Sequence, residues 1–231
     1  DIDTTLRNYP LNCESAEQIV RQIADVEIDD KISFVIKKTE EIMEDSEYQG
    51  VRLSLDAYLD KTRIPLKIDI STGDVITPCE ISFSYQLMFE NRTIPLLAYP
   101  PETVLAEKLE TILSRGEANT RLRDFYDVYI LQREDFVVTP DALCHALLAT
   151  CRKRGHEDLL HTYASILDRV RQSDTMRTQW MKYQTDFDYA AGITWDTVLD
   201  TVETLCMKTL DDHAFGDELP QEESQFEMHL L

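Results

Sequence analysis

Long apolar runs, basic charge and paired cysteines are all scarce in this chain of 231 residues. No apolar run approaches the roughly 18 residues that span a membrane, and no charged-then-apolar signal segment stands at the start. The five cysteines are odd in number and include no Cys-x-x-Cys pair, which argues against a disulfide framework or a zinc site. We therefore expect a cytoplasmic protein with reduced cysteines and no membrane contact.

Positive charge is scarce relative to negative charge. The chain has 44 acidic and 23 basic residues, a net charge of -21. This balance argues against a broadly basic nucleic-acid surface, so an RNA partner would need a local patch and divalent cations. The compact basic cluster Arg152-Lys153-Arg154 is a solvated helix end or, alternatively, a phosphate or tRNA contact. No Walker loop or dinucleotide fingerprint is present.

The most informative stretch, Pro100–Leu131, predicts a helix, a loop and a second helix. Lys108 falls inside the apolar stripe of the first helix, whose other members are Val104, Leu105, Leu109, Ile112 and Leu113. A lysine buried there without a counter-charge would be costly. We expect it to face a carboxylate or a bound phosphate, with a structural salt bridge to a neighbouring helix as the alternative.

The second helix carries an acidic pair. Asp124 and Asp127 stand three residues apart, so they are neighbours on the face opposite the apolar residues. Arg123 can pair with Asp127 at four-residue spacing. The alternative to a functional role is a solvated helix face with ion pairs worth under about 1 kcal/mol each.

Alternating polarity predicts two strands, Val51–Leu59 and Ile64–Ile70, joined by a hairpin turn at residues 60–63. Pro65 indicates that the second strand begins at a sheet edge. Further strands are expected at Lys31–Lys37 and Thr93–Tyr99, and Glu80–Phe89 suits either a strand or a helix. The acidic stretch Glu40–Tyr48 is interpreted as solvated and irregular.

Three carboxylates can share one face of this sheet. In Asp1-Ile2-Asp3, alternation points Ile2 to the core and both acids outward, where they repel each other unless a cation lies between them. Asp69 is the solitary carboxylate on the polar face of its strand. Together they suit two Mg²⁺ ions that clamp an attacking and a leaving oxygen. The alternative is a polar strand edge.

From Pro140 onward the apolar spacing predicts helices at Asp141–Lys153, Glu157–Val170, Thr175–Tyr183 and Trp195–Asp211. An aromatic set is expected to pack between helices rather than to form a base-stacking platform: Trp180, Tyr183, Phe187, Tyr189 and Trp195. Residues 213–231 form an acidic tail that we expect to be disordered.

Several of these stretches together resemble a known family. They are Asp1-Ile2-Asp3, PLKIDISTGD at Pro65–Asp74, and YPPETVLAEKLETILSRGEANTRLRDFYDVYIL at Tyr99–Leu131. The chain resembles the nucleotidyltransferase-like AbiEii/AbiGii toxins of bacterial abortive-infection and type IV toxin–antitoxin systems. Two departures are Arg123, where the family usually has Lys, and the lack of the Gly-Gly or Gly-Ser turn that precedes the D-x-D. The second departure predicts that an N-terminal segment is missing.

The resemblance implies roles for eight residues. Asp1 and Asp3 would hold Mg²⁺, Asp69 would be the third acid, and Lys108 would meet the triphosphate of an NTP. Asp124, with Asp127 less surely, would complete the charged set, and Arg115 and Arg121 would contact phosphate. The acceptor would be a tRNA 3′ end or a protein hydroxyl, and a cognate antitoxin would relieve the growth arrest.

The expected fold is α+β, a mixed sheet flanked by helices and followed by a helical domain. The expected domains are a nucleotidyltransferase-like domain at 1–139, a helical domain at 140–212 and the tail. Two other functions stay open. One is a non-catalytic binding module of the same fold in a phage-defence complex, and the other is a metal-dependent phosphohydrolase that uses the same carboxylates.

Overall fold

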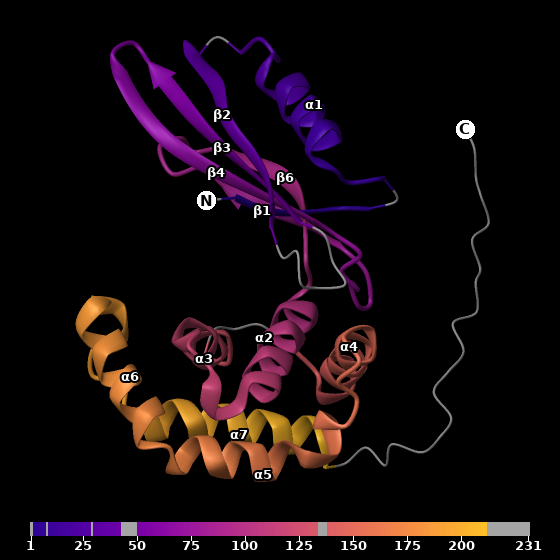
Figure 1. Cartoon of the computed structure of the whole chain (residues 1–231), viewed down its shortest axis with the longest axis vertical. Helices are drawn as coiled ribbons and strands as arrows, with labels where there is room; N and C mark the ends of the chain where they lie inside the picture. Colours follow the sequence, from indigo (N-terminus) through magenta and orange to yellow (C-terminus); the bar gives the residue numbers. More distant parts are fainter. Residues whose placement is uncertain (1, 8, 29, 43–49, 134–137, 212–231) are drawn as a thin grey trace, which may run out of the picture. The chain divides into compact units, whose positions relative to one another are not determined.

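The computed structural model describes residues 2–7, 9–28, 30–42, 50–133 and 138–211. It forms two compact units, Asp1–Val75 and Ile76–Leu231 (Figure 1). A mixed sheet in the first unit and helices in the second confirm the expected α+β fold. The predicted tail lies outside the described residues.

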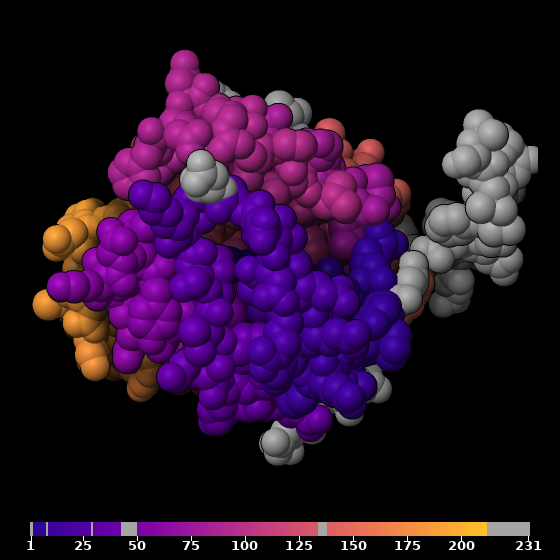
Figure 2. All heavy atoms as spheres, turned by 90° about the horizontal axis from the view of Figure 1, so that it is seen from above, coloured from indigo at the N-terminus to yellow at the C-terminus, as the bar shows by residue number. Residues whose placement is uncertain are grey.

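A four-stranded mixed sheet forms the first unit, in the order β1-β4-β3-β2. Its strands are β1 (Ile2–Leu6), β2 (Ile32–Ile42), β3 (Gly50–Leu59) and β4 (Thr62–Thr72). Strand β1 runs parallel to β4, whereas the β2–β3 and β3–β4 pairs are antiparallel. Seen from above, the atoms of this unit form one continuous indigo to purple surface (Figure 2).

One face of the sheet is buried under helix α1 (Cys13–Ala24). Asn12 caps this helix. Its side-chain oxygen accepts a hydrogen bond from the backbone N–H of Ser15 at 2.8 Å, and the Ser15 hydroxyl accepts one from the backbone N–H of Asn12 at 3.0 Å. The small core combines Leu11, which precedes α1, with buried α1 residues and alternate strand residues: Ala16, Val20, Val51, Leu53, Leu55 and Ile70. Strand alternation therefore sends the intervening polar residues to the opposite face.

Strand β2 is longer than predicted, and β4 begins at a sheet edge as predicted. Strand β2 continues through Ile42, so the predicted irregular segment is wrong for Glu40–Ile42, while residues 43–49 lie outside the described part. The continuation is explained by pairing, since Glu40 to Ile42 stand opposite Arg52 to Gly50. Within the described residues, Pro65 pairs with Asp56 of β3, and β1 pairs with β4 from Ile68 onward. In the described part of the sheet, β4 is thus at an edge where it begins, as predicted.

The second unit begins with a two-stranded sheet, β5 (Ile81–Gln86) and β6 (Thr93–Ala98). Helices α2 (Pro101–Arg115) and α3 (Leu122–Leu131) follow and match the predicted helix pair. The remaining helices are α4 (Pro140–Lys153), α5 (Leu159–Gln172), α6 (Asp174–Asp186) and α7 (Trp195–Leu210). Helix α2 packs against α3 and α4, and α5 against α7 (Figure 1).

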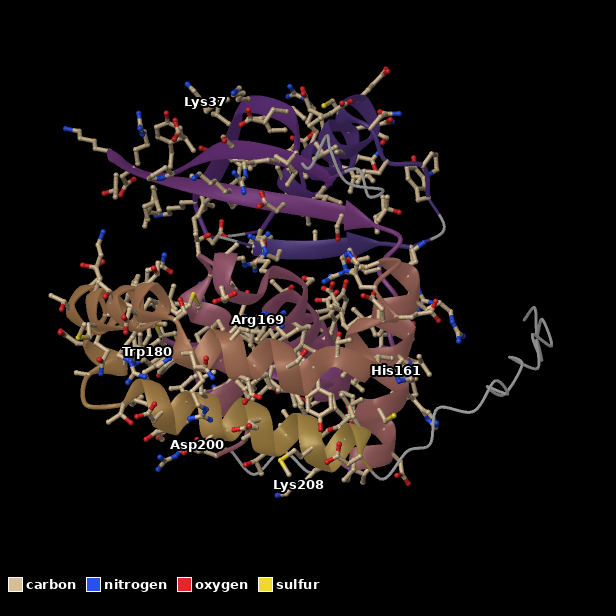
Figure 3. All side chains as sticks on the ribbon, turned by 60° about the horizontal axis from the view of Figure 1, so that its bottom comes forward. Lys37, His161, Arg169, Trp180, Asp200 and Lys208 are labelled. Atoms are coloured by element: carbon tan, nitrogen blue, oxygen red, sulfur yellow. The ribbon has the colours of Figure 1, made fainter. Side chains whose placement is uncertain are left out.

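All six of these helices contribute to one hydrophobic core. Trp180, labelled in Figure 3, is 1% exposed and donates its indole hydrogen to the Ile193 carbonyl at 2.8 Å. Its ring lies 5.7 Å from that of buried Trp195, so the predicted packing role is confirmed for both tryptophans. Helices α2 and α3 thus share their core with the helices after residue 140.

In the described part, no helix combines the length and apolarity that crossing a membrane requires.

Candidate active site

Two of the three predicted sheet carboxylates are neighbours in the structure. Asp3 on β1 and Asp69 on β4 are register partners of a parallel pair. Both lie on the face opposite the α1 core, because the adjacent Ile70 is a core residue and faces alternate along a strand. Asp1 lies outside the described residues, so its role stays a prediction.

Asp69 has a cationic partner that the sequence analysis did not predict. Arg52, its register partner on β3, donates from Nε to Oδ1 at 2.7 Å and from Nη2 to Oδ2 at 2.6 Å. These hydrogen bonds hold the pKa of the Asp69 carboxyl below its ordinary value and raise the pKa of Arg52. The sheet site therefore contains a cation that is paired with one of its carboxylates.

The carboxylate pair fits a magnesium ion in its chemistry. Mg²⁺ binds proteins through one or two carboxylates and completes its octahedron with water and substrate phosphate oxygens. Asp3 and Asp69 supply two such carboxylates from adjacent strands. Among the described residues, no three His, Cys, Asp or Glu side chains gather into a group that could hold a metal. Within the described residues, the candidate metal ligands of this sheet are therefore Asp3 and Asp69 alone.

The Arg52–Asp69 pair gives a prediction on pH. A carboxyl whose pKa is lowered by folding stabilises the protein above its unfolded pKa, about 3.9 for Asp, and this stabilisation is lost as pH falls through the folded pKa. Arg52→Gln should reduce the free energy of unfolding by about 1 kcal/mol or less at pH 7. The difference from the natural protein should shrink below about pH 4.

Urea unfolding followed by circular dichroism at pH 7, 5 and 3.5 measures this difference. Arg63→Gln, on the same hairpin, is the matched control for loss of a cationic side chain. A difference between the natural protein and Arg52→Gln that stays constant down to pH 3.5 would show that Asp69 titrates without help from Arg52.

A second charged group lies between α2 and α3. The Lys108 ammonium on α2 is 2.6 Å from Asp127 Oδ2 and 3.3 Å from Asp124 Oδ1, both on α3. The Lys108 side chain is 21% exposed. The expectation of a facing carboxylate is confirmed, and the contacts are also those of the alternative, a salt bridge to a neighbouring helix. A role towards phosphate stays a prediction.

Asp124 is the buried member of this group. Its side chain is only 4% exposed, so a solvated helix face is wrong for this residue. Arg121 Nε lies 2.9 Å from Asp124 Oδ2, yet this oxygen accepts no hydrogen bond within the described part of the chain. Asp124 therefore depends on Lys108 for its hydrogen-bonded counter-charge.

The predicted arginines differ in position. Arg121 precedes α3 and is paired with Asp124. Exposed Arg115 stands in the last turn of α2, seven residues beyond Lys108 and thus about 10 Å along the axis. Exposed Arg123 has its Nε 3.9 Å from Asp127 Oδ2, which confirms the expected pairing. The structure thus gathers Lys108, Asp124, Asp127 and Arg121 but not Arg115.

Aromatic residues border the charged group. Tyr126, next to Asp127, has its ring 4.7 Å from that of Tyr189, and the Tyr189 hydroxyl is 2.9 Å from that of Tyr183. Burial raises the pKa of Tyr126 and of Tyr183, and Asp127 adds to both shifts. Phe187 and Tyr189 pack on these rings but remain about half exposed.

Sequence reasoning missed a buried carboxylate on α2. Glu110 is 2% exposed, is hydrogen-bonded by Arg154 and lies 2.6 Å from His156 Nδ1. Arg152 pairs with Glu157. Arg152 and Arg154 of the basic cluster are therefore engaged by acids of their own unit, and Arg154 anchors the segment between α4 and α5. The sequence offered one indication of this buried carboxylate, a glutamate at the edge of the apolar stripe of α2.

Comparison with protein-family models places this chain among nucleotidyl transferases. The matching model is "Nucleotidyl transferase AbiEii toxin, Type IV TA system", and it covers residues 1–201 of the chain. The chain belongs to this AbiEii toxin family of type IV toxin–antitoxin systems. The comparisons found no matching curated protein and no matching solved structure.

Proposed function

We propose that this protein is a Mg²⁺-dependent nucleotidyltransferase toxin that moves a nucleoside monophosphate from an NTP to an acceptor hydroxyl. The observation that carries the proposal is the register pairing of Asp3 with Asp69 in a chain of this transferase family. Two carboxylates on adjacent strands are the ligands that a nucleotide-bound magnesium ion takes from a protein. The acceptor is a tRNA 3′ end or a protein hydroxyl.

The residues have separate roles in this proposal. Asp1, Asp3 and Asp69 hold the metal, and Lys108 binds the triphosphate, with Asp124 and Asp127 keeping its ammonium group in place. Arg115 and Arg121 add phosphate contacts. When bound, Mg²⁺ supplies charge neutralisation at the phosphates and at the leaving oxygen.

The transfer is a displacement at the α-phosphorus. The acceptor hydroxyl attacks in line, a new oxygen–phosphorus bond forms, and the bond from the α-phosphorus to the bridging oxygen breaks. Pyrophosphate leaves, and the hydroxyl proton passes to solvent. The contribution of the protein is positioning together with electrostatic stabilisation.

The family also supports a partner and a biological setting. A type IV toxin implies a cognate antitoxin, and the proposed consequence of transfer is growth arrest in the cytoplasm, used against phage infection. The antitoxin relieves this arrest.

A non-catalytic binding module is the second candidate. The observation in its favour is that both central groups already have internal partners. Asp69 is bound bidentately by Arg52, and Lys108 is bound by two carboxylates. Such pairs stabilise a fold without any ligand, and a partner protein would then be the only thing that this chain binds.

Label transfer separates the two candidates. The full chain is incubated with Mg²⁺ and each α-³²P-labelled NTP in turn, with total tRNA and the protein itself as acceptors. We expect label on one acceptor, because the metal-bound α-phosphate is then the group transferred. Label in RNA identifies a tRNA-modifying toxin, whereas label in protein identifies a protein-modifying one.

Two variants control this experiment. Asp3→Asn removes one proposed metal ligand from an exposed strand position and should abolish the label. Asp60→Asn, in the exposed β3–β4 turn, makes the same chemical change outside the site and should keep it. Absence of label with folded natural protein and every NTP would overturn the transferase proposal in favour of the binding module.

A further inference from the structure

Four charged residues form one row across the sheet of the first unit. Asp3 is the register partner of Asp69, Asp69 that of Arg52, and Arg52 that of Glu40. Residues in register point to the same face. Arg52 is thus the cation in a row that otherwise consists of three carboxylates.

Arg52 occupies both oxygens of Asp69. Its Nε and Nη2 donate to Oδ1 and Oδ2 at 2.7 and 2.6 Å, the parallel arrangement in which a guanidinium grips a carboxylate most strongly. Asp3 and Glu40 also act on the arginine through their charge. In this state the guanidinium is the counter-ion of Asp69 and lies beside Asp3, whereas Glu40 is also paired with Lys38, whose Nζ is 2.5 Å from Glu40 Oε2.

A divalent cation at Asp3 and Asp69 would compete with this guanidinium. Arg52 donates to both oxygens of Asp69, the atoms that a metal would also bind, and the metal repels the positive charge of the arginine. Arg52 has freedom to move, because its side chain is 37% exposed and is carried on a flexible stem. A guanidinium fork fits a phosphate as well as it fits a carboxylate.

We propose that Arg52 is an exchangeable counter-ion: it holds Asp69 in the metal-free protein and transfers its guanidinium to a phosphate of the nucleotide when a divalent cation binds Asp3 and Asp69. Arg52 is then a positioning residue that keeps the carboxylates in place before loading and contacts the triphosphate afterwards. This inference rests on the proposed transferase function. The competing explanation is a cross-strand salt bridge that only supports the sheet.

Binding measurements on the full chain test the exchange without any turnover. Mn²⁺ binding is followed by electron paramagnetic resonance, first alone and then with a non-hydrolysable NTP analogue. Arg52→Gln should bind Mn²⁺ alone about tenfold more tightly, since a positive charge beside the ion is removed. The same variant should bind the metal–nucleotide complex about tenfold more weakly, since a charged phosphate contact is lost.

Two further variants make the result specific. Arg52→Lys keeps the charge without the fork, so it should bind Mn²⁺ alone like the natural protein and still bind nucleotide weakly. Arg63→Gln removes an exposed arginine of the same hairpin, which pairs with Asp56, and should change neither affinity. Far-UV circular dichroism confirms that each variant is folded.

The outcomes separate this inference from the function on which it rests. Natural protein that binds Mn²⁺ and nucleotide while Arg52→Gln behaves like Arg63→Gln would overturn the exchange and leave the transferase proposal standing. Natural protein and Arg52→Gln that both fail to bind Mn²⁺ and nucleotide would overturn the metal site and the exchange together. Opposite shifts of the metal and nucleotide affinities in Arg52→Gln would support the exchange, because a purely structural salt bridge predicts neither.

Discussion

Lys108→Met is expected to destabilise the helical unit by about 3 kcal/mol, because it leaves a buried carboxylate without its hydrogen-bonded counter-charge. Asp124 is 4% exposed, and Lys108 is the residue that donates to it. Arg121 lies close to Asp124 Oδ2 but is itself more than half exposed and not aligned for a hydrogen bond. Urea unfolding at pH 7 measures the loss.

A double-variant cycle tests the cause of this loss. Lys108→Met combined with Asp124→Asn removes the buried charge together with its partner, so much of the stability should return. Asp124→Asn alone should cost less than Lys108→Met, since Lys108 keeps its 2.6 Å contact with Asp127. A Lys108→Met protein as stable as the natural one would show that Arg121 alone neutralises Asp124.

The same cycle separates stability from transfer. If Lys108 binds the triphosphate, both Lys108→Met and the double variant should lose label transfer by two orders of magnitude or more, on the order of what one electrostatic group contributes. The double variant is the informative protein, because it should be folded yet inactive. Lys108→Ala by itself would confuse the two effects.

The Lys108 group was predictable because helical periodicity is local. A lysine between apolar residues of one turn requires a counter-charge, and the neighbouring helix in the sequence carried Asp124 and Asp127. Burial of Asp124 was not predictable in the same way. It depends on the packing of α3 against other helices, α2 with Lys108 among them, and the pattern of α3 does not contain this information.

The pairing of Arg52 with Asp69 was not predicted because the predicted hairpin turn had the wrong length. A hairpin loop of four residues, 60–63, would pair Leu59 with Ile64 and place Arg52 opposite Ser71. The structure has a two-residue loop, Asp60 and Lys61, so Leu59 pairs with Thr62 and Arg52 with Asp69. The register of a hairpin follows its loop length. The two-residue difference between the predicted and the observed loop therefore decides whether Arg52 or another residue lies opposite Asp69.

Glu110 shows a different limit. Its partners, Arg154 and His156, follow 44 and 46 residues later in the chain, across α3 and α4. Periodicity identifies the buried face of α2 but carries no information on which distant segment covers it. The sheet order could not be predicted for the same reason, because β1 pairs with residues of β4 that are more than 60 positions away in the sequence.

Asp69→Asn should lower nucleotidyl transfer by about 10²–10³-fold while leaving the protein folded. The Asp69 side chain is 25% exposed and its arginine partner 37%, so loss of the ion pair should cost about 1 kcal/mol or less in stability. The amide retains one oxygen for Arg52 but lacks the charge that a metal ligand needs. Initial rates of label transfer and urea unfolding measure the two effects.

Asp56→Asn is the matched control for Asp69→Asn. Asp56 lies four residues after Arg52 on β3, so it shares the polar face, and its side chain is 6% exposed between Arg63 and Lys37. This substitution should cost more stability than Asp69→Asn, because it leaves two cations around a more buried site, and it should preserve transfer. Near-normal transfer by Asp69→Asn would reduce Asp69 to a structural partner of Arg52 and remove it from the metal site.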